Sequence, residues 1–307
     1  MVIRFASAPC GSGKTYQLIE RAIRICTSGD KVLLAQPTTV LAEETEKAFR
    51  SRSGCPPLQV FNTNTVGRGV ARQLSDYLAS PQDDGPEIII CTHQVLSHLP
   101  FLAMGQKWHL LIDECPQVHR EATHNLPDTH RMITENIALE PYGNRYDHVI
   151  VDDEEALKQV AYNKDSDEVF GVLQETARIL ISPHWQTFVL RESFEALLDG
   201  SGKQLTFHSI LPSTFLSRFA SVFICGANFE DSGIYKLWRN EVEWCQDTKF
   251  ENNLRYAAHE NGNLLAVYYA VEGNWSRGKR EDCSKEIREA AVAIFQERPF
   301  VLFGLQY

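Results

Sequence analysis

A glycine-rich turn followed at once by lysine and threonine, at residues 11–15, constrains the fold more than any other stretch of the sequence. It stands between an apolar run at residues 2–6 and a segment from residue 15 onward in which apolar residues recur every three or four positions. That order predicts a buried strand, a tight turn and a helix. Glycines let the backbone N–H groups of such a turn converge on an anion, and the helix adds the positive end of its dipole. The segment therefore predicts a phosphate-binding loop.

Two side chains of this loop have specific expected roles. Lys14 can reach the outer phosphates of a nucleotide as a point charge, and the Thr15 hydroxyl can bind Mg²⁺. The residues expected to contact the nucleotide are Ala8, Cys10, Gly11, Ser12, Gly13, Lys14, Thr15 and Tyr16. The usual pattern opens with glycine, where this chain has Ala8. The alternative is a glycine turn that lysine and threonine follow by chance, and the strand and helix patterns on either side disfavour it.

The composition is that of an ordinary globular protein with room for two domains. The chain has 307 residues, of which 43% are apolar and 23% are charged. It has no apolar run long enough to span a membrane, and its eight cysteines form no C-x-x-C pair. These features predict a cytoplasmic protein without a membrane segment, a disulfide framework or a zinc site.

The net charge of −10 is unevenly distributed along the chain. Residues 1–100 carry +1, residues 101–205 carry −9 and residues 206–307 carry −2. A surface that follows the phosphates of a nucleic acid must therefore be local. The acidic middle third disfavours tight, non-specific binding to a duplex, while a groove that follows one strand is compatible with it.

Strand and helix patterns alternate through the first third of the chain. After the loop, apolar runs predict strands at residues 31–36, 58–61, 87–91 and 108–112, with helical patterns between them at residues 39–49, 66–78 and 94–99. A further apolar run at residues 221–225 indicates that the sheet resumes there. The alternation predicts an α/β fold, in which helices cover both faces of a parallel sheet and ligands bind at the carboxyl ends of its strands.

Residues 121–204 are predicted to be a mostly helical insertion with an acidic exterior. Residues 117–202 contain no buried strand run like those above. Helical periodicity is present instead at residues 168–181 and 193–198.

A run of four acids and three histidines in this insertion are the candidates for a metal site. The acids at residues 152–155 fit a solvated helix start better than a metal site. The spacing of His124, His130 and His148 matches no metal-binding pattern, so these histidines are expected at the surface.

Two carboxylates, Asp113 and Glu114, come directly after the apolar residues 108–112. In a phosphate-loop fold this strand lies beside the loop. Asp113 is then expected to hold Mg²⁺ through water, and Glu114 to act as general base towards the attacking water. Solvation of a strand end by two acids is the alternative, and the phosphate loop about a hundred residues earlier favours the functional interpretation.

Five segments, taken in order, resemble the first RecA-like motor domain of a superfamily 2 helicase or translocase of the DExH-like type. The segments are residues 8–15 for motif I, 36–43 for motif Ia, 91–96 for motif Ib, 113–116 for motif II and 226–228 for motif III. The resemblance covers mainly residues 1–116 and 206–232. It implies a motor domain at residues 1–120 and 205–235, the insertion at 121–204, and a linker with an incomplete second RecA-like domain at 236–307.

The resemblance implies a nucleic-acid-dependent ATPase that uses Mg²⁺ and moves along or unwinds DNA or RNA. Glu114 and Lys14 are then the catalytic residues, and Thr15 and Asp113 hold the metal. The residues implied to contact nucleic acid are Pro37, Thr38, Thr92 and His93, and those implied to couple hydrolysis to movement are Gly226, Ala227 and Asn228. Residues 91–96 resemble the Thr-His-x-x-Leu form of motif Ib found in DNA branch-migrating members, which favours DNA over RNA.

The tail resembles the opening of the second motor domain. It has a strand pattern at residues 264–270, a helix pattern at 285–296 and a last strand pattern at 301–305. A loop at residues 272–280 combines Trp275 with three basic residues, which suits stacking and phosphate contact. A solvated surface loop is the favoured interpretation of that stretch.

The sequence departs from the family pattern at several places. Motif II has Pro116 where many members have histidine or aspartate, and motif III keeps only its central alanine, Ala227. The glutamine motif that reads adenine in the DEAD-box branch is missing before Ala8. Motifs V and VI, with their arginine fingers, do not occur before Tyr307, so this chain alone is expected to bind nucleotide far better than it hydrolyses it.

Two other functions stay open from the sequence. A small-molecule phosphotransferase can use the same phosphate loop, although Pro37-Thr38 and Thr92-His93 are then coincidences. A non-catalytic, ATP-gated binding module can use the loop as a switch, with the acidic insertion recruiting a protein partner.

Overall fold

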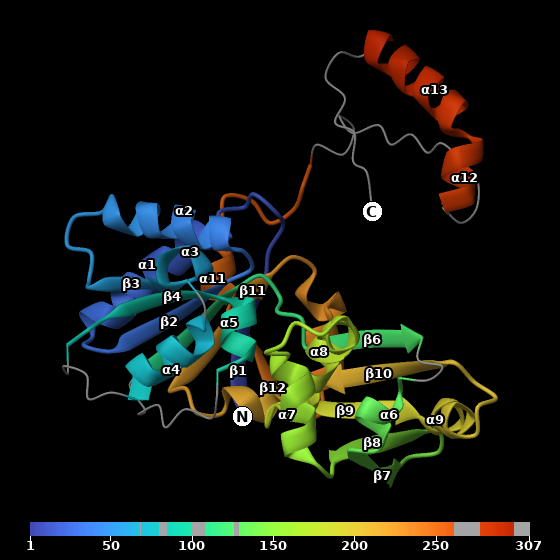
Figure 1. Ribbon diagram of the computed structural model, residues 1–307. Helices are drawn as coiled ribbons and strands as arrows, with labels where there is room; N and C mark the ends of the chain where they lie inside the picture. Colours follow the sequence, from blue (N-terminus) through green and yellow to red (C-terminus); the bar gives the residue numbers. More distant parts are fainter. Residues whose placement is uncertain (68, 80–84, 100–107, 126–128, 261–276, 298–307) are drawn as a thin grey trace. The chain divides into compact units, whose positions relative to one another are not determined.

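The computed structural model describes residues 1–307 except 68, 80–84, 100–107, 126–128, 261–276 and 298–307 (Figure 1). The chain divides into two compact units, residues 1–258 and residues 259–307. The first unit contains two β-sheets, one parallel and one antiparallel.

A seven-stranded parallel sheet forms the centre of the first unit. Its strands lie in the order β12-β1-β11-β5-β2-β4-β3, and every neighbouring pair is parallel. The strands are β1 Val2–Ser7, β2 Lys31–Gln36, β3 Leu58–Phe61, β4 Ile88–Thr92, β5 Trp108–Asp113, β11 Ser221–Gly226 and β12 Glu243–Gln246. All six residues of β2 are buried, because helices cover both faces of the sheet. The predicted parallel α/β fold is confirmed.

Two hydrophobic cores lie on the two faces of this sheet. Side chains alternate along β2, so that Leu33 and Ala35 pack into one core and Val32 and Leu34 into the other. The helices α4 Val70–Ala79, α5 His93–Ser97 and α10 Gly233–Trp238 cover the first face, and α1 Lys14–Thr27, α2 Thr39–Arg50 and α11 Thr248–Glu251 cover the second (Figure 1). Two short 3₁₀ helices, Ser213–Leu216 and Phe229–Asp231, flank β11.

The predicted helix at residues 66–78 is wrong in one respect, because the structure has two helices there. The short α3 Thr63–Val66 ends before Gly67, and α4 begins at Val70. Gly67 and Gly69 have φ values of 81° and 73°, in the left-handed region that a helix does not use. The two glycines therefore separate the helices.

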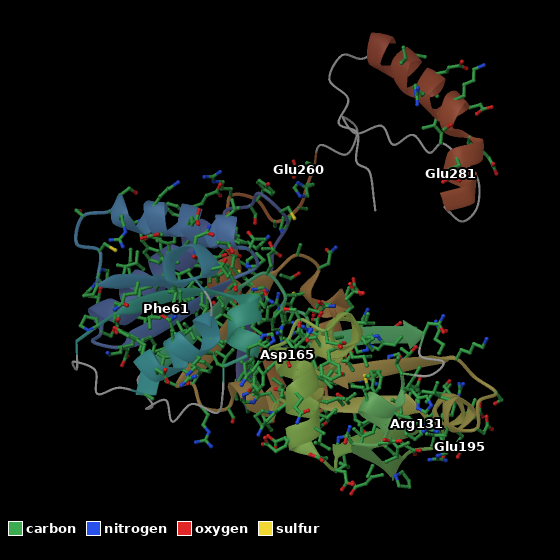
Figure 2. The ribbon with its side chains drawn as sticks, viewed as in Figure 1. Phe61, Arg131, Asp165, Glu195, Glu260 and Glu281 are labelled. Atoms are coloured by element: carbon green, nitrogen blue, oxygen red, sulfur yellow. The ribbon has the colours of Figure 1, made fainter. Side chains whose placement is uncertain are left out.

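The insertion contains a five-stranded antiparallel sheet, so its prediction as mostly helical is wrong. The strands β6 His119–Asn125, β7 Ile137–Tyr142, β8 Tyr146–Val151, β9 Gln186–Leu190 and β10 Gln204–Ile210 lie in the order β6-β10-β9-β8-β7. The helices of the insertion are α6 Arg131–Thr134, α7 Glu154–Tyr162, α8 Glu168–Leu180 and α9 Arg191–Leu198. In Figure 2, Arg131 lies on α6, Asp165 between α7 and α8, and Glu195 on α9, whereas Phe61 ends β3 of the parallel sheet.

The sequence does not predict these strands because their sheet is buried on one face only. The helices α7, α8 and α9 pack on one face only, where Leu205, Phe207 and Val189 join their core. Along β10 the buried residues alternate with Thr206, His208 and other partly exposed residues. An antiparallel sheet with one wet face therefore shows alternation instead of the continuous apolar run on which the prediction depended.

The four acids at residues 152–155 begin a helix, as predicted. The Asp153 carboxylate accepts a hydrogen bond from the Ala156 N–H at 2.9 Å and caps α7, while Glu154 and Glu155 both pair with Lys158. Among the residues that the structure describes, no three histidine, cysteine, aspartate or glutamate side chains are grouped to hold a metal ion. His124 and His130 are half-buried and contact Thr176 and Thr134 respectively, so they are less exposed than expected.

The borders of the domain that holds the parallel sheet differ from those predicted for the motor domain. Residues 243–246 form β12, an edge strand of the parallel sheet beside β1, where the sequence predicted a linker. The strand β10, predicted in the motor domain from residue 205, belongs to the antiparallel sheet. Both strands have few apolar residues, so the sequence pattern gives a weak signal. Their positions are set by pairing with strands that are distant in the sequence.

The second unit contains two described helices, α12 Arg277–Asp282 and α13 Ser284–Glu297. The latter agrees with the helix predicted at residues 285–296. The strands predicted at residues 264–270 and 301–305, and Trp275, lie outside the described residues. None of the described helices is long and apolar enough to cross a membrane.

Candidate functional site

The loop after β1 and the acids after β5 meet at one edge of the parallel sheet. Strands β1 and β5 are both neighbours of β11, and all three run in the same direction, so their carboxyl ends lie together. The Ala8 N–H donates to the Gly226 carbonyl at 3.0 Å, which ties the start of the loop to the end of β11. This is the edge at which ligands bind in such sheets.

The loop has the backbone of an anion-binding turn. Gly11 and Gly13 have φ values of 77° and 92°, which glycine adopts without strain. The buried Ser12 hydroxyl donates to the Pro9 carbonyl at 2.8 Å and holds the turn closed. Gly13 is the N-cap residue of α1 and, as a glycine, makes no side-chain cap hydrogen bond to the first turn of that helix. The first N–H groups of a 14-residue helix therefore point at the place predicted for phosphates.

The Lys14 ammonium group contacts three oxygen atoms. Its Nζ lies 3.0 Å from Glu114 Oε1 and 3.3 Å from each of the Ala8 and Pro9 carbonyl oxygens. The side chain is buried, which disfavours its charged form, but the hydrogen bond and the charge of Glu114 outweigh burial and raise the pKa of Lys14 above its ordinary value. Lys14 is therefore a cation at neutral pH.

Thr15 and Asp113 form the second contact between loop and strand. The Thr15 hydroxyl donates to Asp113 Oδ2 at 2.7 Å, although 98 residues separate the two. Asp113 is buried, and burial raises the pKa of its carboxyl group, an effect that Glu114 increases and the Thr15 hydrogen bond opposes. A hydroxyl and a carboxylate at this spacing are the hard oxygen ligands that Mg²⁺ prefers. The two residues therefore fit the metal role predicted for them.

Glu114 has a backbone conformation that is uncommon for its residue type. Its φ of 66° lies in the left-handed region, where a side chain other than glycine is strained. The conformation places the half-exposed carboxylate against Lys14 at the mouth of the loop. Strain of this kind concentrates at functional sites, which agrees with a role for Glu114 in catalysis.

The predicted nucleic-acid residues lie at the same sheet edge, where β2 and β4 end. Thr38 and Thr92 are the N-caps of α2 and α5, and their hydroxyls accept hydrogen bonds from Leu41 N at 3.1 Å and Val95 N at 3.3 Å. Each hydroxyl thus has a structural use. Thr38 is exposed and Thr92 is half-buried, so Thr38 is the more accessible of the two.

His93 contacts the end of β5. Its Nε2 lies 2.9 Å from the Asp113 carbonyl oxygen, which accepts the hydrogen bond, so Nε2 carries the proton. Burial lowers the pKa of His93, and the ring is therefore neutral at pH 7. His93 and Pro37 also line a cavity of about 320 Å³, together with Pro116 and Arg120 from the chain that leads into the insertion. The cavity joins the end of β5 to the predicted nucleic-acid residues.

The segment predicted to couple hydrolysis to movement contacts both the phosphate loop and the acidic end of β5, through Gly226. A side chain on Gly226 would lie 2.5 Å from Cys115 Sγ, so the residue after Glu114 packs directly on this glycine. Asn228 adopts φ 49°, and the neighbouring Phe229 N–H donates to the Ser7 hydroxyl at 3.2 Å. The segment 226–228 is thus placed to sense changes in both loops, and its coupling role stays a prediction.

One part of the site was missed from the sequence. Residues 253–256 lie along the outside of the phosphate loop, where the Arg255 N–H donates to the Ser12 carbonyl at 2.9 Å and the Tyr256 hydroxyl donates to the Cys10 carbonyl at 2.8 Å. The Gln17 amide donates to the Asn253 carbonyl at 2.9 Å. These residues belong to a polar stretch without periodicity, so no sequence signal indicated the contact.

Fold and site together define a phosphate-loop nucleotide-binding protein with a RecA-like sheet. Residues 2–136 match the family model of the DEAD/DEAH box helicase. The match supports a RecA-like motor domain of helicase superfamily 2 for these residues, a class whose general activity is ATP hydrolysis with Mg²⁺ in response to nucleic acid. No curated protein matches the chain.

Proposed function

We propose that this chain is a nucleic-acid-dependent ATPase of the helicase type, which hydrolyses MgATP in order to move along or unwind a nucleic acid. One observation carries the proposal. The pairs Lys14–Glu114, at 3.0 Å, and Thr15–Asp113, at 2.7 Å, join the phosphate loop to the end of β5 at one edge of the sheet. A phosphate-binding cation, two metal ligands and a carboxylate base are the groups that ATP hydrolysis requires.

The geometry supports a specific role for the Lys14–Glu114 pair. The three N–H donors of Lys14 are occupied by Glu114 and by the Ala8 and Pro9 carbonyls. A phosphate that binds Lys14 must displace one of them, and Glu114 is the half-exposed partner, on a side chain that can move. Displacement then frees the Glu114 carboxylate to accept a proton from the attacking water.

Mg²⁺, when bound, neutralises charge on the phosphate oxygens. Thr15 and Asp113 are the residues that hold it in this proposal. Burial keeps water away from Asp113, so an ionised Asp113 lacks solvation until a cation approaches. The site therefore favours the nucleotide together with its metal.

The proposed path of the nucleic acid follows the helix starts at the ends of β2 and β4, with Pro37, Thr38, Thr92 and His93 as contacts. Helix N-termini and hydroxyls suit phosphate oxygens. We propose DNA as the preferred strand, and a cytoplasmic location. We also propose that residues 259–307 belong to a second RecA-like domain.

The insertion is proposed to bind a protein partner. The open face of its sheet presents exposed Tyr142 and Tyr146 and the carboxylates of Glu121 and Glu140. No lysine or arginine occupies the positions of that face on its five strands. A partner with basic side chains fits such a surface.

The proposal is tested by hydrolysis and binding measured on the same protein. MgATP turnover is expected to rise when single-stranded DNA or RNA is added. Lys14→Ala is expected to abolish binding of a fluorescent ATP analogue, because the phosphates lose their cation. Glu114→Gln is expected to keep binding and to lower turnover by about a hundredfold or more, the contribution of a general base. The exposed Lys47, on α2, provides the control variant Lys47→Ala, which should behave like wild type.

Three outcomes contradict the proposal. Equal loss of binding in Lys14→Ala and Glu114→Gln removes the roles assigned to them. Binding of MgATP without any turnover, with or without nucleic acid, indicates a non-catalytic ATP-gated module instead. Transfer of the phosphoryl group to an added small acceptor indicates a phosphotransferase.

A further inference from the structure

The chain that leaves the parallel sheet returns to the phosphate loop before it enters the second unit. After β12, the Asp247 carboxylate pairs with Arg21 of α1 at 2.8 Å, and Phe250 packs on Phe223 of β11. Glu251 then accepts a hydrogen bond from the Ser7 N–H at 2.9 Å. Residues 253–256 are thus held against the start of α1 by contacts on both sides, and their position beside the loop is fixed by the fold.

Within this segment, the backbone of Arg255 is bonded to the loop while its side chain lies along Gly13. The Arg255 N–H donates to the Ser12 carbonyl at 2.9 Å. A side chain on Gly13 would lie 3.7 Å from both Cγ and Nε of Arg255, so the glycine leaves the space in which the arginine stem lies. The N–H groups of this part of the loop are those that face phosphate in the proposed site.

The charge of Arg255 has no counterpart in the described part of the chain. The residue is exposed, and among the described residues no carboxylate forms an ion pair with it. Lys14, the other cation of the loop, is buried and already paired with Glu114. A guanidinium presents its donors as a planar fork that matches two phosphate oxygens at once. Arg255 therefore places beside the phosphate loop a second cation, which is free to bind an anion.

We propose that Arg255 binds the phosphate chain of the nucleotide, as a cation that the segment after β12 supplies to the loop within the same chain. The inference rests on the proposed function and adds a ligand contact to it. Tyr256 has a different part, because its hydroxyl bond to the Cys10 carbonyl, at 2.8 Å, fixes the segment without offering a charge. Binding of phosphates by Arg255 also links occupancy of the loop to the chain that leads into the second unit.

The test measures binding of a fluorescent ATP analogue with Mg²⁺ to the full chain, and its displacement by tripolyphosphate, which has no base or sugar. Arg255→Ala is expected to weaken binding of both compounds by about tenfold, the effect of one charge-assisted contact of about 1.4 kcal/mol. Arg255→Lys should recover part of the affinity, since it keeps the charge but loses the fork. Arg72→Ala, at an exposed arginine of α4, should bind within about twofold of wild type. Tyr256→Phe should lose less affinity than Arg255→Ala, because it removes a hydrogen bond of the segment but no charge.

Several results overturn the inference. Wild-type affinity of Arg255→Ala for both compounds means that the guanidinium does not touch the nucleotide. A loss shared equally by Tyr256→Phe, without recovery in Arg255→Lys, means that the segment acts by its structure alone. A loss for the ATP analogue but not for tripolyphosphate places Arg255 at the base. If the wild-type protein binds no MgATP at all, the proposed function fails together with this inference, which distinguishes that case from the others.

Discussion

Asp113 combines two properties that oppose each other in the free protein. Its carboxylate is 1% exposed at the end of an apolar strand, and its one strong hydrogen bond comes from the Thr15 hydroxyl. Burial therefore raises the pKa of Asp113, which means that the ionised form is less stable in the fold than in water. A metal ligand must nevertheless be ionised. An ionised Asp113 therefore lowers the stability of the metal-free protein, and it is this ionised form that binds the metal.

Asp113→Asn is expected to raise the free energy of unfolding at neutral pH without Mg²⁺. The unfolded chain releases its proton near the ordinary pKa of 3.8, while the folded chain holds it to a higher pH. Wild-type stability therefore falls as the pH rises from 3.8 through the folded-state pKa, and it stays lower above that value. Asparagine has no such titration and still accepts the Thr15 hydrogen bond.

The measurement is urea unfolding of both proteins across this pH range. The advantage of Asp113→Asn should be largest near pH 7.5 and should disappear towards pH 3, below the unfolded-state pKa. Stabilisation of the protein by MgATP should be lost in the variant. A variant that is less stable than wild type at pH 7.5 refutes the argument.

Helix starts at the sheet edge serve structure and proposed function at the same time. Thr38 caps α2 through its hydroxyl, which lies 3.1 Å from the Leu41 N–H, and the residue is exposed towards the proposed path of the nucleic acid. Removing the Thr38 hydroxyl, as in Thr38→Ala, removes the helix cap and the proposed nucleic-acid contact together. Aspartate separates them, because it caps a helix as well as threonine does but repels phosphate.

Thr38→Asp is expected to keep the free energy of unfolding within about 0.5 kcal/mol of wild type and to weaken binding of single-stranded DNA by about tenfold at low salt. Thr38→Ala should lower the free energy of unfolding by about 1 kcal/mol through loss of the cap. Urea unfolding and fluorescence anisotropy with a labelled oligonucleotide give the two readouts. Equal DNA affinity in Thr38→Asp and wild type shows that the strand does not pass this residue.

The elements that the sequence predicted well are those whose environment is uniform. The strand β2 is covered on both faces, so its six residues form a continuous apolar signal. The strand β10 has one wet face, and its buried residues Leu205 and Phe207 alternate with polar ones. Such alternation is short and weak, which is why the insertion was predicted as mostly helical. A strand in the middle of a parallel sheet is thus easier to recognise than one in a half-exposed antiparallel sheet.

The candidate site was predictable where local pattern and chemistry coincide. Lys14 and Thr15 follow a glycine turn, and Asp113 and Glu114 end an apolar strand, so the sequence alone indicated that they meet. The contact of Arg255 with the loop has no local signal, because it depends on β12 pairing with β1 and returning the chain to α1. Contacts between distant segments without a motif are decided by tertiary packing, which periodicity does not report.

The border of the motor domain follows from the same packing and can be tested by truncation. Residues 236–258 complete the parallel sheet with β12, bury Trp238 and Phe250, and cover the phosphate loop with residues 253–256. The Trp238 ring N–H also donates to the Leu211 carbonyl at 2.8 Å. Removal of one large buried aromatic side chain costs about 3–5 kcal/mol, a large part of the stability of a domain.

A chain cut after residue 258 is therefore expected to unfold cooperatively on heating and to bind MgATP within about twofold of the full chain, because it keeps the first unit complete. A chain cut after residue 235, the border that the sequence predicts, should not fold, since it loses β12, both aromatic residues and the cover of the loop. Circular dichroism melting and binding of a fluorescent ATP analogue compare the two. Cooperative melting of the shorter chain at the temperature of the longer one contradicts this border, because residues 236–258 then contribute nothing to the fold of the motor domain.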